Sequence, residues 1–90
     1  MRVTLLTQQE CALCDQAKEI LGQLQREFDL EVSVLDMASA EGAALAKRGG
    51  IMFPPGIFLG GEAFSYGRPS ERKLRREFER RAVPAPREMG

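Results

Sequence analysis

The sequence contains no histidine, tryptophan or asparagine, and it has only two cysteines. Without histidine, the chain has no residue for Ser–His or Cys–His catalysis and no imidazole to bind a metal. Two cysteines are also too few for a four-ligand Cys/His zinc site within one chain. These absences exclude histidine-dependent nucleophilic hydrolases and single-chain sites of the zinc-finger kind.

Long hydrophobic runs are missing as well. A membrane-spanning helix needs about 20 consecutive apolar residues, and the apolar runs here are far shorter. Residues 3–6 are too short for a secretory signal, and no small-residue cleavage site follows them. Two cysteines are too few for a secreted disulfide framework. We therefore expect a cytoplasmic protein that does not associate with membranes.

The chain is long enough for one folded domain. It has 90 residues, of which 43% are hydrophobic and 29% are charged, and this composition is typical of a globular protein. The apolar spacing and the turn residues predict the order β-α-β-α-β-β-α. The predicted segments are residues 3–7, 12–28, 30–35, 39–48, 57–59 and 62–66, with a last helix that has Ser70 as its N-cap.

These segments predict an α/β fold. The first half is a right-handed parallel βαβ unit, and the second half is an antiparallel hairpin, turning at Gly60 and Gly61, that is closed by a helix. We expect a four-stranded mixed sheet with helices on both faces. The predicted domain covers residues 1–83, and the proline-containing end, residues 84–90, is predicted to be a mobile tail.

The two cysteines form the motif Cys11-Ala12-Leu13-Cys14, between the first predicted strand and the first predicted helix. Free N–H groups at a helix start act as partial positive charge and favour a thiolate. Cys11, at the edge of the helix, receives most of this effect. Cys14, one turn later, is placed to resolve a mixed disulfide by attacking Cys11. A Cys-x-x-Cys motif beside a βαβ pattern indicates a thioredoxin-like redox pair.

Other interpretations of this segment remain open. The cysteines could be ordinary buried residues, or two chains could each contribute two thiolates to a shared zinc or iron–sulfur site. In that case the protein would be a non-catalytic binding module. Asp15, directly after the pair, is either a proton carrier for the reaction or an ordinary exposed acid at a helix start.

Pro54 and Pro55 stand directly before a predicted buried strand. They form either a rigid loop or a tight turn in which Pro55 is cis and lies against the cysteines. Such a turn exposes backbone edges that can pair with an extended substrate. Gly56, the next residue, gives room for a close approach.

Several of these segments together resemble the glutaredoxin branch of the thioredoxin superfamily, over residues 2–80. The resemblance is carried by residues 3–7, by the cysteine motif with Asp15, and by the run Pro55-Gly56-Ile57-Phe58-Leu59-Gly60-Gly61. It implies a thioredoxin fold in which Cys11 is the attacking thiolate, Cys14 the resolving thiol and Pro55 the cis proline. In this family the residue before the cis proline offers its backbone to a bound peptide. Here that residue is Pro54, which has no N–H, so one substrate hydrogen bond is expected to be missing.

Three departures from the family pattern concern glutathione. Glutathione-using glutaredoxins carry a lysine shortly before the first cysteine, where this chain has Gln8, and a tyrosine within the pair, where it has Ala12 and Leu13. The stretch that holds the amino end of glutathione matches Ser65-Tyr66-Gly67-Arg68-Pro69, which has no carboxylate. This stretch looks more like that of the glutaredoxin-like electron donors of ribonucleotide reductase, which take electrons from thioredoxin reductase. A group of small glutaredoxin-like proteins also resembles the chain in Cys-x-Leu-Cys-Asp and Phe-Ser-Tyr-Gly-Arg.

We therefore expect a monomeric thiol–disulfide oxidoreductase that reduces protein or small-molecule disulfides. Cys11 and Cys14 are the predicted catalytic residues, with thioredoxin reductase, or less favourably glutathione, as the reductant and with no bound metal or cofactor. The residues predicted to contact substrate are Leu13, Pro54, Pro55, Gly56, Tyr66 and Arg68.

The charge is divided unevenly along the chain. Residues 1–67 hold 5 basic and 9 acidic residues, whereas residues 68–90 hold 8 basic and 4 acidic ones. The basic last helix is either a solvated face with i,i+4 pairs, such as Glu71–Arg75 and Glu77–Arg81, or a docking patch for an acidic partner protein. Nucleic-acid binding is not expected, because the isoelectric point is about 6.3 and the aromatic residues are expected to be buried.

Overall fold

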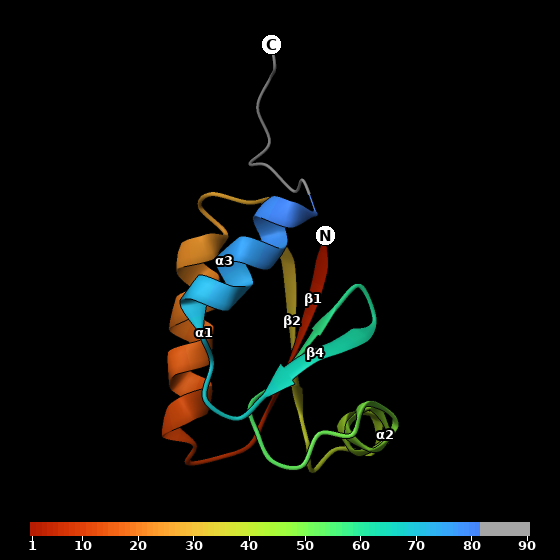
Figure 1. The fold of residues 1–90 in the computed structure, drawn as a ribbon. Helices are drawn as coiled ribbons and strands as arrows, with labels where there is room; N and C mark the ends of the chain where they lie inside the picture. Colours follow the sequence, from red (N-terminus) through yellow and green to blue (C-terminus); the bar gives the residue numbers. More distant parts are fainter. Residues whose placement is uncertain (82–90) are drawn as a thin grey trace.

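The computed structural model describes residues 1–81, and the predicted tail, residues 84–90, lies outside this part of the chain. Seven elements follow one another in the predicted order (Figure 1). They are β1 (Arg2–Thr7), α1 (Ala12–Leu24), β2 (Glu31–Asp36), α2 (Ala40–Gly49), β3 (Gly56–Leu59), β4 (Glu62–Tyr66) and α3 (Glu71–Arg80).

The four strands form one mixed sheet in the order β2-β1-β3-β4, as the sequence predicts. Strand β1 runs parallel to β2 and antiparallel to β3, and β4 runs antiparallel to β3. The register places Leu6 opposite Gly56, and Gly56 opposite Tyr66. The end of β1, the start of β3 and the end of β4 therefore lie together at one end of the sheet, which is the lower end in Figure 1. We call this the cysteine end, because the loop that follows β1 leads to Cys11.

Helices cover both faces of the sheet. Figure 1 shows α1 and α3 side by side on one face and α2 beyond the other. The larger core lies under α1 and α3, where the rings of Phe28 and Phe78 are 5.5 Å apart between centroids. The smaller core lies under α2 and is built from four buried residues: Leu6, Ala46, Ile51 and Phe58. Apolar burial on both faces supplies the main driving force for this arrangement.

Helix α1 is shorter than its apolar pattern predicts, since it ends at Leu24 rather than Phe28. Residues 25–27 form a turn in which the amide of Glu27 donates to the carbonyl of Leu24 at 3.0 Å. The side chain of Phe28 is nevertheless buried against α3. A helix that continues to Phe28 and a turn that places Phe28 in the core give the same spacing of apolar residues. The spacing alone therefore does not show where the helix ends.

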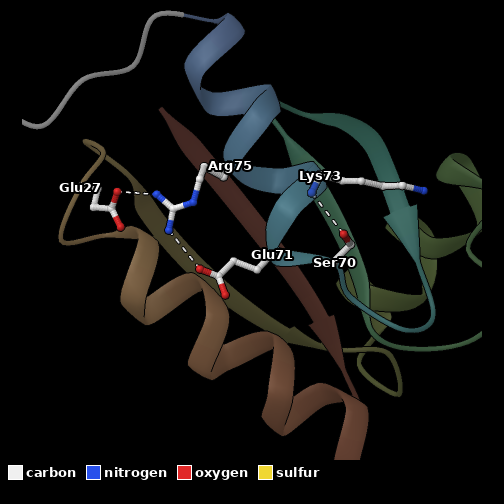
Figure 2. Close-up of polar contacts among 5 residues, drawn as sticks. All are labelled: Glu27, Ser70, Glu71, Lys73 and Arg75. Carbon is white, nitrogen blue, oxygen red and sulfur yellow. Dashed lines mark hydrogen bonds and ion pairs between the residues drawn. The ribbon is translucent and has the colours of Figure 1, made fainter.

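The other two helices begin at serine N-caps. The hydroxyl of Ser70, the predicted cap of α3, accepts a hydrogen bond from the amide of Lys73 at 3.1 Å (Figure 2). Ser39 caps α2 in the same way through the amide of Gly42 at 2.9 Å. Each cap satisfies one of the amides that a helix leaves unpaired at its start.

Strand β4 contains a bulge that the sequence pattern does not reveal. Ile57 pairs with Ser65 and Phe58 pairs with Ala63, so Phe64 has no partner on β3. A bulge of this kind bends the strand and changes the direction of the residues that follow it. The two residues between β3 and β4, Gly60 and Gly61, have φ of 60° and 89°, as expected for a tight hairpin turn.

Strand β2 is less buried than its alternation of valines suggests. Val32 packs against the larger core, but Val34 is 50% exposed. Because β2 lies at the edge of the sheet, its side chains have a neighbouring strand on one side alone.

Within residues 1–81, the helices are too short or too polar to cross a membrane.

Candidate functional site

The cysteine pair occupies the first turn of α1. Cys11 is the N-cap, with an extended backbone (φ −125°, ψ 101°), and Cys14 lies within the first turn. Their Cα atoms are 5.2 Å apart and their sulfur atoms are joined in a disulfide. The two residues between them therefore bring the sulfurs together across one helical turn, as the Cys-x-x-Cys spacing predicts.

The two sulfurs have different surroundings. Cys14 is buried, with 1% of its surface exposed, whereas Cys11 is partly exposed. The Sγ atom of Cys11 also accepts a hydrogen bond from the amide of Cys14 at 3.1 Å. An amide aimed at Sγ stabilises negative charge there, and it acts together with the partial positive charge of the helix start. Cys11 is therefore the sulfur that is both more accessible and better placed to carry a thiolate.

The chain turns sharply just before the pair. Glu10 has a φ of 52°, a left-handed conformation that is uncommon outside glycine, asparagine and aspartate. It follows the end of β1 by three residues and directly precedes Cys11, so it redirects the chain from the strand into α1. Glutamate carries no sequence signal for this conformation, and sequence reasoning missed it.

The acidic and apolar neighbours of the pair lie near the surface. Asp15 is exposed in the first turn of α1, where a carboxylate favours the positive end of the helix. Leu13, predicted to contact substrate, is half-buried. Among residues 1–81, no three or more Cys, Asp or Glu side chains are arranged to hold a metal ion.

The proline loop reaches the same end of the sheet. Pro55 is buried and Pro54 is half-buried, and the peptide bond between them is cis. The carbonyl of Pro55 accepts a hydrogen bond from the amide of Gly67 at 2.9 Å, which ties this loop to the end of β4. The cysteine end therefore gathers three of the predicted segments: the cysteine motif, the proline loop and the stretch after Tyr66.

Gly56 packs closely against the loop that follows α2, and its predicted contact with substrate stays a prediction. It is buried, and a Cβ atom built on it would lie 3.0 Å from the side chain of Ile51. The close approach that this glycine allows is therefore an internal contact with Ile51. This contact positions the start of β3 against the loop that follows α2.

The expectation that the aromatic residues are buried is wrong for two of them. Phe53 is 55% exposed and Tyr66 is 42% exposed, and their rings meet edge-on with centroids 5.1 Å apart. Met52, beside Phe53, is 73% exposed. Sequence reasoning missed Met52 and Phe53, although their position directly before two prolines, outside any periodic segment, was a usable signal.

Arg68 and Tyr66 lie together beside a small hollow. Its volume is about 140 Å³, and it is lined by Phe64, Ser65, Tyr66, Arg68, Ser70 and Lys73. A larger hollow of about 610 Å³ lies toward the opposite end of the sheet, where Arg2 and Gly60 are among its lining residues. Neither cysteine lines either of these hollows, so we assign the candidate site to the cysteine end from the position of the cysteine pair itself.

Most of the acidic residues of α3 are paired with its arginines. Glu71 binds Arg75 at 3.0 Å and Glu77 binds Arg81 at 2.6 Å, which confirms both predicted i,i+4 pairs. Arg75 also binds Glu27, just after α1 (Figure 2). Hydrogen bonds from Arg80 and Arg81 lower the pKa of Glu77 to about 2, and the hydrogen bond from Arg75 lowers the pKa of Glu27.

Comparison with known proteins adds a family and a fold. Residues 2–79 match the family model of the glutaredoxin-like domain (DUF836). No curated protein matches the chain. Among solved structures, the chain is similar to a single-substitution mutant of a thioredoxin from Halobacterium salinarum NRC-1, with a TM-score of 0.69 and 22% sequence identity, over 94% of this chain and 77% of that one.

The structural similarity establishes the thioredoxin fold, in agreement with the strand order and the placement of the helices. The family match covers β1 to α3 almost completely, and with them the cysteine pair and the proline loop. A glutaredoxin-like fold with a cysteine pair in disulfide contact supports a redox function in general terms. The chain therefore belongs to the glutaredoxin-like domain family, and it has a thioredoxin fold.

Proposed function

We propose that this protein is a thiol–disulfide oxidoreductase that reduces disulfides of other molecules through Cys11 and Cys14. The observation that carries the proposal is the asymmetry of the pair. Cys11 is partly exposed and its Sγ atom accepts a hydrogen bond from the amide of Cys14, whereas the side chain of Cys14 is buried. An electron carrier of this kind needs one sulfur that attacks the substrate disulfide and a second sulfur close enough to resolve the mixed disulfide.

The proposed reaction has two steps. The thiolate of Cys11 attacks one sulfur of the substrate disulfide, forms a mixed disulfide and releases the other substrate sulfur as a thiolate, which takes up a proton. Cys14 then loses its proton and attacks Sγ of Cys11, which releases the second substrate thiol. Two electrons pass to the substrate, and the protein is left with the Cys11–Cys14 disulfide.

The chain has no histidine to take the proton of Cys11, so the surroundings of the pair have to stabilise the thiolate. The amide of Cys14 and the start of α1 hold the negative charge of the Cys11 thiolate. The leaving thiolate can take its proton from water, because Cys11 is not fully buried. Asp15, exposed in the first turn, directly follows Cys14 in the sequence and is a candidate proton carrier for the second step.

The residues at the cysteine end also support a choice of reductant. Gln8 and Arg68 are both exposed. In the glutathione-using glutaredoxins that the chain resembles, a lysine occupies the position of Gln8, and the stretch that matches residues 65–69 carries carboxylates. We propose that the disulfide is reduced by thioredoxin reductase rather than by glutathione. The 22% identity to a thioredoxin supports the fold alone, so this part of the proposal depends on the residues of the site.

The test supplies NADPH with either thioredoxin reductase or glutathione plus glutathione reductase, and it follows NADPH consumption with insulin as substrate. We expect turnover with thioredoxin reductase and at least tenfold less with glutathione. Cys11→Ser should abolish turnover, because the attacking sulfur is lost. Cys14→Ser should accumulate a mixed disulfide with the substrate, which mass spectrometry detects.

Two results would overturn the proposal. Undiminished turnover in Cys11→Ser would remove the role of Cys11. A dimer that native mass spectrometry finds to be metal-bridged, and that a chelator dissociates, would instead favour a binding module in which two chains share four thiolates.

A further inference from the structure

Three exposed apolar residues belong to the segments that meet at the cysteine end. Met52, Phe53 and Tyr66 are 73%, 55% and 42% exposed, and we call them the apolar patch. Phe53 and Tyr66 come from segments far apart in the chain, yet their rings are in contact. Exposed apolar groups that cluster in this way mark a surface that binds another molecule.

Two hollows flank Tyr66. One, of about 340 Å³, lies toward α2 and is lined by Gly49, Ile51, Ala63, Phe64, Ser65 and Tyr66. The other, of about 140 Å³, lies toward the start of α3 and includes Arg68, Ser70 and Lys73 in its lining. Tyr66 lines both hollows and its ring contacts Phe53, so the apolar patch and the two hollows adjoin one another at Tyr66.

The charges on this surface have a single sign. Arg68 and Lys73 line the second hollow, and no acidic residue lines either hollow. Within residues 1–81, no carboxylate forms an ion pair with Arg68 or Lys73.

Two of the three acidic residues of α3, Glu71 and Glu77, are paired with arginines. Glu71 and Arg75 point toward Glu27, and Lys73 extends to the opposite side of the helix (Figure 2). Glu77 is held by Arg80 and Arg81. The pair Glu71–Arg75 therefore faces α1, and Lys73 projects away from it.

We propose that this surface binds an extended acidic segment of a protein substrate. An aromatic or aliphatic side chain of the segment would cover the apolar patch, and a carboxylate would lie between Arg68 and Lys73. The proposal deepens the proposed function and rests on it, because the segment is the part of the substrate that brings its disulfide to Cys11. Charge complementarity selects an acidic segment, and two cations beside apolar groups suit a peptide better than the phosphate row of a nucleic acid.

The test uses synthetic peptides that are each closed by one disulfide and carry one phenylalanine. Three versions differ in their flanking residues alone, which are glutamate, glutamine or lysine. The pre-reduced protein is mixed with each peptide, and the second-order rate constant of reduction is measured without any reductase. We expect the glutamate peptide to react about fivefold faster than the lysine peptide, with less difference at high salt.

A matched pair of variants locates the effect on the surface. Lys73→Glu and Arg76→Glu make the same change of charge on the same helix at exposed residues, but only Lys73 lines the hollow. The ratio of the glutamate rate to the lysine rate should fall to one or below in Lys73→Glu. In Arg76→Glu the ratio should fall by less than half.

A second measurement separates this proposal from the proposed function. Peptides with serine in place of both cysteines are titrated against the oxidised protein, and binding is followed by fluorescence anisotropy. Selective binding of the glutamate version without reduction of any disulfide peptide would retain the docking surface and remove the oxidoreductase. Equal rates and equal binding for all three versions, or an equal effect of both variants, would overturn the docking surface.

Discussion

The ring of Phe53 meets the ring of Tyr66 edge-on, 5.1 Å away between centroids, and it lies directly over Gly67. A Cβ atom built on Gly67 would be 2.8 Å from the Phe53 ring, and the glycine has a φ of 82°. The backbone at Gly67 therefore packs directly against the Phe53 ring of the apolar patch. The amide of Gly67 also donates a hydrogen bond to the carbonyl of Pro55, so the same glycine contacts both the proline loop and Phe53.

Gly67→Ala should therefore lower the free energy of unfolding by about 2 kcal/mol or more, since left-handed strain and a clash with Phe53 act together. Gly61→Ala is the control, because Gly61 has a similar φ of 89° but open space around its Cβ position. It should lose about 1–2 kcal/mol from strain alone. Urea unfolding of both variants measures the difference, and an equal loss would show that Phe53 does not rest on Gly67.

The reduced protein should react with iodoacetamide at Cys11 much faster than at Cys14. Cys11 is accessible and its sulfur accepts an amide hydrogen bond, whereas Cys14 is 1% exposed. A low dose of reagent followed by peptide mapping should find the label on Cys11 in the great majority of labelled molecules. Equal labelling of the two cysteines would contradict the roles assigned to them.

Pro54→Val should improve the use of peptide substrates. Proline offers no N–H to a bound peptide, and valine restores one at the same position of the loop. One hydrogen bond contributes about 0.5–1.5 kcal/mol, so the KM for a peptide disulfide should fall about two- to tenfold. The reduction of 4,4′-dithiodipyridine, which has no peptide backbone, provides the comparison, and its KM should fall by less. An unchanged KM for every peptide disulfide would remove the backbone of residue 54 from substrate binding.

Glu77 should make the protein sensitive to acid. Hydrogen bonds from Arg80 and Arg81 lower its pKa to about 2 in the folded protein, from about 4.5 in the unfolded chain. A lowered pKa contributes stability that is fully present above pH 4.5 and is lost as the pH falls toward 2. Glu77→Gln should therefore be less stable than the wild type at pH 7, and the difference should disappear near pH 2. Parallel urea midpoints across this range would show that the two arginines do not stabilise the Glu77 carboxylate.

Local signals in the sequence predict much of the fold. The alternation of residue types, the glycine pair and the serine cap specify where most elements begin and end, because each of these signals acts within a few residues. The pairs Glu71–Arg75 and Glu77–Arg81 could be predicted for the same reason. The Cys-x-x-Cys motif likewise carries its own geometry, since a helical turn fixes the separation of its two residues.

Features that depend on distant segments could not be predicted in this way. Arg75 binds Glu27 across 48 residues, and no local pattern joins the two. The exposure of Phe53 and Tyr66 depends on how the proline loop meets the end of β4, and the early end of α1 depends on the burial of Phe28. The left-handed Glu10 shows a further limit, because here tertiary structure overrides the preference of the residue.

The bulge at Phe64 has a consequence for the lifetime of complexes. A regular edge strand binds a passing strand through a ladder of backbone hydrogen bonds, but a bulge interrupts that ladder. In the proposed complex, a substrate beside β4 would be held by side chains alone, namely those of the apolar patch, Arg68 and Lys73. We expect such a complex to dissociate rapidly, and rapid dissociation would suit the proposed electron carrier, which has to leave one protein before another reduces it.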